Sequence, residues 1–149
     1  MTAGPFLLYD TTLAALMAGT LNPLADTDIT AVLLSPAYVP DLAAHTTYAD
    51  ISAAEIIGSD YRQLRLTGGM VAPLSGAAAA FTSDPLNWGN PVTLPPTRYM
   101  TLLLGLPSAL TPASPLIGVQ QLTTGAVEAV RGAFTVSPPA GGWFHLARG

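Results

Sequence analysis

Proline and glycine interrupt this sequence so often that no apolar segment continues far before a turn. The 149 residues include 14 Gly and 14 Pro. The longest apolar run, residues 99–110, is broken by Pro107 and is too short to cross a bilayer, which takes about 20 residues. Short apolar runs bounded by turn residues favour β-strands. The pattern therefore predicts one β-rich domain spanning residues 1–149.

The predicted fold is an antiparallel β-sandwich, jelly-roll or Ig-like, with about seven to nine short strands. Ile29–Leu34 is apolar throughout, which predicts a strand buried on both faces. Residues 61–67 alternate with period two, and Gly68-Gly69 then precedes residues 70–72, which predicts a type I′ hairpin. Further strands are expected at residues 78–82, 92–94, 98–104, 116–122, 133–136 and 143–146, with turns at 83–85, 87–91, 95–96, 107–115 and 138–142.

A short helix is expected near the N-terminus. Leu13, Leu16 and Met17 have helical spacing, Asp10 or Thr11 is a candidate cap, and Gly19 is a plausible stop. Residues 1–8 before it are interpreted as an extended arm, and 107–115 as a Pro-rich exposed loop. The first residues lack a positively charged region, so no secretory signal peptide is predicted.

Charged residues are scarce. They make up 9% of the chain, while hydrophobic residues make up 50%; an average soluble domain is about 25% charged. So few charges leave apolar surface uncovered, which indicates burial against other chains. Five basic against nine acidic residues, a net charge of −4, argue against nucleic acid as a partner. The lack of cysteine excludes disulfides and Cys-ligated metal or cluster sites.

No motif in the sequence indicates catalysis, a cofactor or a metal, and the chain is predicted not to be an enzyme. His45 and His145 are the available general bases, and each is interpreted as an ordinary loop or strand histidine. Asp26 and Asp28 form an Asp-x-Asp without the rest of a calcium loop. The glycine pairs lack the lysine and the spacing of a phosphate-binding loop. Trp88 and Trp143 are interpreted as core or interface anchors.

Several segments that together cover nearly the whole chain form a distinctive combination. They are Tyr9-Asp10, residues 18–21, residues 26–34, Ala37-Tyr38 with Asp41, residues 45–51, Glu55-Ile56 with Gly58, Tyr61 with residues 64–68, Trp88, residues 98–104, residues 115–118, residues 134–136 and Trp143-Phe144. In this combination the chain resembles a family of small structural proteins of tailed-phage virions. The lack of lysine and the Pro-rich insertion at 107–115 depart from the family pattern.

The resemblance implies a head-associated protein of the decoration, cement, head-fibre or head-spike type; some relatives are labelled minor tail proteins. The expected location is the capsid surface of the virion, after synthesis in the host cytoplasm. The expected partners are the major capsid protein and further copies of the chain, in a homo-oligomer such as a trimer, with no nucleic acid and no membrane. Residues 1–8 and 107–115 are the expected contact regions.

The alternative is a tail, baseplate or fibre-associated module that binds the host surface. Its candidate glycan site consists of exposed Tyr38, Tyr48, Trp88 and Tyr99 with nearby aspartates. Saturable binding to a host polysaccharide distinguishes this alternative from the capsid hypothesis.

Overall fold

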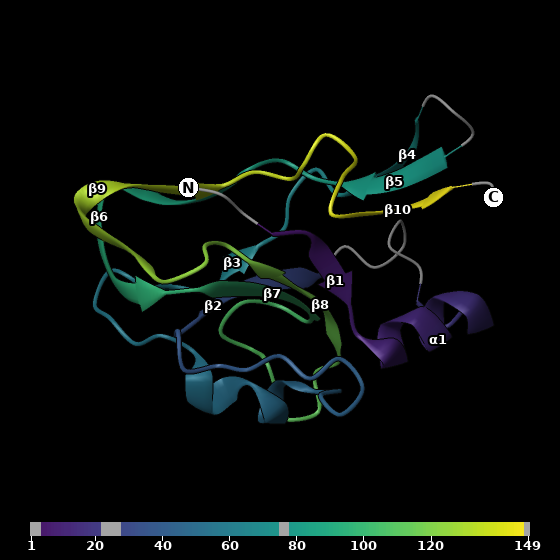
Figure 1. Ribbon diagram of the computed structural model, residues 1–149, viewed down its shortest axis with the longest axis horizontal. Coiled ribbons are helices and arrows are strands. Elements are labelled where there is room, and N and C mark those ends of the chain that lie inside the picture. Colours follow the sequence, from purple (N-terminus) through teal and green to yellow (C-terminus); the bar gives the residue numbers. More distant parts are fainter. Residues whose placement is uncertain (1–3, 22–27, 75–77, 148–149) are drawn as a thin grey trace.

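The computed structural model describes residues 4–21, 28–74 and 78–147. These contain ten β-strands, one α-helix and two short 3-10 helices. The chain is mainly β, and every strand pair is antiparallel, as predicted. The arrangement is sandwich-like, although its second strand layer is divided into two parts (Figure 1).

A central sheet of five strands organises the molecule. Its order is β1 (Phe6–Leu8), β8 (Leu116–Gln121), β7 (Tyr99–Leu104), β2 (Ile29–Leu34) and β3 (Leu64–Arg65). All six residues of β2 are buried, which confirms the prediction for this apolar run. Because alternate residues of a strand point to opposite faces, Ala31 and Leu33 enter one apolar core and Val32 and Leu34 another.

Strands cover the first face of this sheet. A long, irregular ribbon pairs β6 (Leu86–Thr97) with β9 (Val127–Val136). A smaller sheet has the order β10 (Phe144–Ala147), β5 (Ala78–Thr82) and β4 (Met70–Leu74). The ribbon and the small sheet lie on the same side of the central sheet (Figure 1). We call this cover the strand layer.

The two tryptophans anchor the strand layer to the central sheet. Trp88 is 0% exposed and packs edge-to-face on Phe134, with ring centroids 5.9 Å apart. Its indole N–H donates to the Arg62 carbonyl at 2.9 Å. Trp143, 2% exposed, donates to the Ser83 hydroxyl at 2.8 Å. Both were predicted as anchors, and both belong to the core.

Irregular chain covers the opposite face. Residues 35–55, which include the 3-10 helices Tyr48–Asp50 and Ser52–Ala54, lie there with residues 105–115. We call this cover the loop layer (Figure 1). The core beneath it has its own set of buried residues, namely Tyr9, Val32, Leu34, Tyr38, Ile51, Tyr99, Leu103, Leu116 and Val119.

The predicted hairpin at Gly68-Gly69 is wrong. β3 pairs with β2 in the central sheet, while β4 pairs with β5 in the small sheet. Gly68 alone of the two glycines has a positive φ, +63°, whereas a type I′ turn needs two such residues. A Cβ at Gly68 would lie 2.7 Å from the Asp84 carboxylate. The glycines therefore mark the passage of the chain from one layer to the other.

The predicted turns at residues 87–91 and 95–96 are also wrong, because the structure places both inside β6. The β6–β9 pairing contains four shifts of register along this stretch. Proline is tolerated at such irregularities and in strands with an unpaired edge, because no ladder hydrogen bond is lost. β6 pairs only with β9 among the described strands, which explains why its prolines do not end it.

The predicted N-terminal helix is present as α1 (Asp10–Ala18). Gly19 ends it with φ +73° and donates its N–H to the carbonyls of Ala15 and Leu16. The helix lies at one end of the central sheet (Figure 1). None of the helices in the described part of the chain is long and apolar enough to span a membrane.

Candidate functional site: a groove beside the first strand

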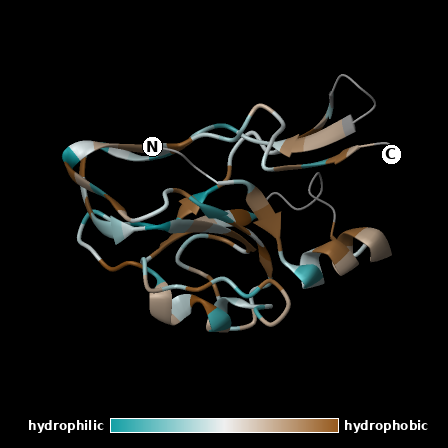
Figure 2. Cartoon of the chain, viewed as in Figure 1, coloured by the Kyte–Doolittle hydropathy of each residue, from teal (hydrophilic) through white to brown (hydrophobic). Residues whose placement is uncertain are grey.

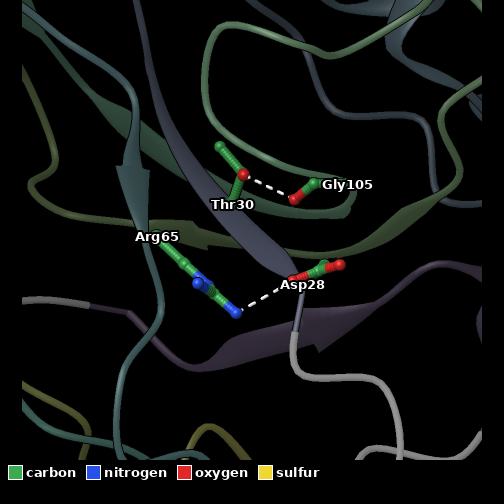
Figure 3. A network of polar contacts seen from close by, with 4 residues as sticks. All are labelled: Asp28, Thr30, Arg65 and Gly105. Carbon is green, nitrogen blue, oxygen red and sulfur yellow. Dashed lines mark hydrogen bonds and ion pairs between the residues drawn. The ribbon is translucent and has the colours of Figure 1, made fainter.

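The two edges of the central sheet have different chemistry. At the β3 edge, Arg65 pairs with Asp28 at 2.9 Å, while Thr30 on β2 donates to the Gly105 carbonyl at 2.7 Å (Figure 3). Charged side chains at an edge hinder pairing with a further strand. The β1 edge instead carries the sequence Phe-Leu-Leu. Only the β3 edge is therefore protected by charge.

The backbone of β1 has a side that faces away from the sheet. Leu7 lies opposite Val119, and the Tyr9 N–H donates to the Ile117 carbonyl at 3.2 Å. In an antiparallel ladder, residues that bond to the partner alternate with residues that do not. Phe6 and Leu8 therefore direct their N–H and C=O groups away from β8. No other described strand pairs with β1.

An apolar groove of about 550 Å³ follows this edge. β1 and Leu13 line it, together with Leu42, which packs on the loop-layer core, and with Trp143 and Phe144, which belong to the strand-layer core. A second hollow, of about 500 Å³, shares Pro5, Leu7 and Leu42 with it. No Asp, Glu or Arg lines either hollow. We call the two together the β1 groove.

Exposed apolar side chains lie on the strands and the helix that contribute to the β1 groove. Leu7 and Leu13 are each 45% exposed, Leu146 is 70% exposed and Met17 is 91% exposed. We call these four residues the N-terminal face. Apolar stretches of α1, β1 and β10 occupy this end of the molecule (Figure 2). A cluster of this kind is typical of an interaction surface rather than of scattered exposed residues.

The helix exposes its apolar residues because little of it packs on the sheet. Thr12 is the buried residue of α1, and its hydroxyl donates to the Leu116 carbonyl at 2.8 Å. Leu13 and Met17, one turn apart, therefore remain on the outer side of the helix.

The two contact regions predicted from the sequence have different structures. Of residues 1–8, residues 1–3 lie outside the described residues, and Phe6–Leu8 is not a free arm but a paired strand. The loop 107–115 is largely exposed, as predicted, but it is tied to the fold. Ser108 donates its N–H to the Gln63 side chain at 2.8 Å, and Ser114 is buried.

His45 belongs to a hydrogen-bonded chain that the sequence interpretation did not predict. The Tyr38 hydroxyl contacts the His45 Nδ1 atom at 2.8 Å and the Tyr9 hydroxyl at 2.9 Å. The Tyr38 and His45 rings also stack, with centroids 5.5 Å apart. Burial raises the pKa of both tyrosines above the ordinary value. Neutral tyrosines therefore hold the histidine against the loop-layer core.

Glu55 is the centre of a second polar cluster in the loop layer. Its carboxylate accepts hydrogen bonds from the Tyr48 hydroxyl, from the Tyr61 hydroxyl at 2.6 Å and from the Gln63 amide at 3.0 Å. Burial, followed by the contact with Glu55, raises the pKa of Tyr48 to about 12 and also raises that of Tyr61. These donors come from different turns of residues 35–63, so the cluster fastens irregular chain together. Sequence reasoning gave Glu55 no role.

The remaining sequence candidates do not form a site. Asp28 pairs with Arg65, and Asp26 lies outside the described residues. His145 is exposed and lines the β1 groove. The described residues contain no group of three His, Cys, Asp or Glu that could hold a metal ion.

The aromatic set proposed for glycan binding is wrong as an exposed site. Tyr38, Trp88 and Tyr99 are 5%, 0% and 7% exposed. Trp88 lies in the core under the strand layer, while Tyr38 and Tyr99 lie in the core under the loop layer. Because the two cores occupy opposite faces of the central sheet, these rings do not form one surface.

Comparisons with known proteins complete the description of the site. No protein-family model matches the chain. A search of curated proteins and a search of solved structures also found no match. The β1 groove is therefore interpreted from its own geometry and chemistry.

Proposed function

We propose that this chain is a structural subunit of a tailed-phage virion that attaches to the outer capsid surface and stabilises the particle. The observation that carries the proposal is an exposed apolar side chain, Leu106, on a loop that hydrogen bonds hold in place. The resemblance of the sequence to phage virion proteins supplies the biological context. Buried apolar area is the main source of such adhesion.

The loop 105–115 is the part of the surface that we assign to the capsid contact. It carries Leu106, which is 43% exposed. Contacts with Gln63 and Ser114 hold the loop in one conformation. A loop ordered before binding loses less conformational entropy on binding than a flexible one. Many copies on one particle add avidity to each individual contact.

Labelling of the parent virion with an antibody against this chain tests the proposal directly. Electron microscopy is expected to show label distributed over the head. Label confined to the tail would contradict the capsid assignment and favour the alternative, a tail or baseplate module. Absence of label from purified virions would contradict both.

A variant series then tests the contact itself. Particles prepared without the protein are incubated with the wild-type chain or with Leu106→Glu, and bound protein is measured after sedimentation. We expect at least a tenfold loss of binding for Leu106→Glu, because a carboxylate must be desolvated at the interface. Val130→Glu is the matched control, since Val130 is 71% exposed on β9. Equal binding by the two variants would contradict the assignment of the loop.

A further inference from the structure

We propose that the β1 groove receives β1 of a second copy of this chain, so that two copies pair edge to edge about a twofold axis. This inference goes beyond the proposed function and does not depend on the phage assignment. It rests on the direction of the backbone groups of β1, the charge of the groove and the shape of the surrounding surface.

The backbone of β1 specifies the register of the pair. Phe6 and Leu8 direct their N–H and C=O groups away from β8, as derived from the β1–β8 ladder. In an antiparallel pair of identical strands, Phe6 of one copy exchanges both hydrogen bonds with Leu8 of the other. Leu7 of each copy then lies opposite Leu7 of the other, at the twofold axis. The central sheets of the two copies become one continuous sheet.

The charge of the groove favours a copy of the same chain. A twofold contact buries the same patch of both copies, so a patch that carries charges of one sign would repel itself. The chain has a net charge of −4, yet no Asp, Glu or Arg lines the β1 groove. The acidic character of the protein therefore does not oppose self-association at this place.

The side chains of β1 match the groove in which β1 would lie. The strand is apolar on both of its faces, with Leu7 on one and Phe6 and Leu8 on the other. The groove is likewise apolar on both sides, with Leu42 on one and Phe144 on the other. A stable interface covers about 800 Å² on each partner, roughly a tenth of the 7640 Å² surface of the chain. Leu13, Met17 and Leu146 extend the contact beyond the strand.

A cysteine at the proposed axis gives the sharpest test, because the chain contains no cysteine of its own. Residues opposite each other in a non-hydrogen-bonded antiparallel pair have Cα atoms about 4.5 Å apart, within the range of a disulfide. Leu7→Cys is expected to form a covalent dimer on mild oxidation, seen on a non-reducing gel. Val130→Cys, at an exposed position on β9, is the matched control. It is expected to form no covalent dimer and to run as a monomer on the same gel.

Solution mass provides a second test that does not alter β1. Light scattering coupled to size exclusion is expected to show a dimer for the wild-type chain. Leu13→Lys, which places a charge beside the groove, should weaken dimerisation at least tenfold, while Val130→Lys should not. Circular dichroism verifies that each variant is folded. Hydrogen exchange should show the Phe6 and Leu8 amides protected in the dimer and exposed in the Leu13→Lys monomer.

Several outcomes would overturn the proposal. A wild-type chain that is monomeric at 100 micromolar would show that the groove does not bind a second copy. A trimer would exclude twofold pairing of β1. A dimer that survives Leu13→Lys and does not cross-link through Leu7→Cys would place the interface elsewhere. Protection of β1 only on capsid binding would assign the groove to the capsid protein. The first three results do not bear on where the protein lies in the virion, which the antibody label decides.

Discussion

The two faces of the central sheet are covered in contrasting ways. On one face, the strand layer contributes a row of apolar side chains, including Trp88, Phe134 and Trp143. On the other face, the loop layer adds two polar clusters, one around Tyr38 and one around Glu55. Both faces therefore bury an apolar core, but the irregular cover also needs specific side-chain hydrogen bonds.

The difference follows from how each cover treats its backbone. Strands satisfy their N–H and C=O groups in ladders, so their side chains are free to be apolar. Irregular chain has no continuous ladder, so some of its backbone groups take side-chain partners. Asp50, for example, accepts hydrogen bonds from the N–H groups of Thr46 at 2.8 Å and Thr47 at 3.0 Å. The loop layer thus depends on a few polar residues, whereas the strand layer depends on buried area.

Truncation of the strand-layer core should have the largest effect. Trp88→Ala removes a fully buried indole and leaves a cavity between the strand layer and the central sheet. We therefore expect a loss of about 3–5 kcal/mol in the free energy of unfolding. Chemical denaturation in urea measures it. Trp88→Phe keeps most of the volume and should lose distinctly less. A loss below about 1 kcal/mol for Trp88→Ala would contradict the role of this layer as the main apolar cover.

Removal of the Glu55 carboxylate should have an intermediate effect. Glu55→Ala leaves the Tyr48 and Tyr61 hydroxyls without their acceptor, which costs about 1–3 kcal/mol. Hydrogen exchange should increase in residues 35–63 and stay unchanged in the strand layer. Glu128→Gln, at an exposed position on β9, is the matched control and should stay within about 0.5 kcal/mol of the wild type. Equal loosening of both layers by Glu55→Ala would contradict the division between them.

Removal of the Tyr48 hydroxyl should have the smallest effect. Tyr48→Phe is expected to lower the free energy of unfolding by about 1 kcal/mol at neutral pH. This cost is expected to shrink at alkaline pH. The pKa of Tyr48 is raised to about 12 in the folded chain, while an unfolded tyrosine ionises near 10. Between these values the unfolded chain releases the proton first, so the wild type loses stability as the pH rises.

Denaturation at pH 8 and at pH 11 tests this dependence. The difference in stability between the wild type and Tyr48→Phe should be larger at pH 8 than at pH 11. A difference that grows with pH would show that the surroundings do not hold Tyr48 neutral. It would contradict the view that the Tyr48–Glu55 hydrogen bond helps to stabilise the loop layer.

The strands of the central sheet were largely predictable from the sequence, and its two covers were less so. Apolar runs bounded by turn residues revealed β2, β7 and β8, whereas in the strand layer the prolines of β6 were mistaken for turns. The Glu55 cluster escaped detection because residues 35–63 have no period that could place Tyr48 beside Glu55. The glycines at 68 and 69 marked a change of direction but could not indicate that the chain moves between layers.

The candidate site was predictable only as a region. Residues 1–8 were expected to contact a partner as an extended arm. That Phe6–Leu8 forms a sheet edge depends on its pairing with β8, whose residue Val119 lies far along the chain. A single sequence does not show such a distant pairing. The uncharged lining of the β1 groove depends on that pairing as well, because β1, α1 and β10 meet only in the folded chain.

The continuity of the long strands has a mechanical consequence. β6 of the ribbon is joined to β7 of the central sheet by a single residue, Arg98. In the same way, β8 of the central sheet is followed along the chain by β9 of the ribbon. A pull applied to the ribbon therefore travels along covalent backbone into the middle of the central sheet. Both connections lie at the same end of the ribbon, where Thr97 pairs with Val127. The ribbon is therefore fixed to the central sheet by covalent backbone at that end, at a point between β1 and β2, and by side-chain packing along the rest of its length.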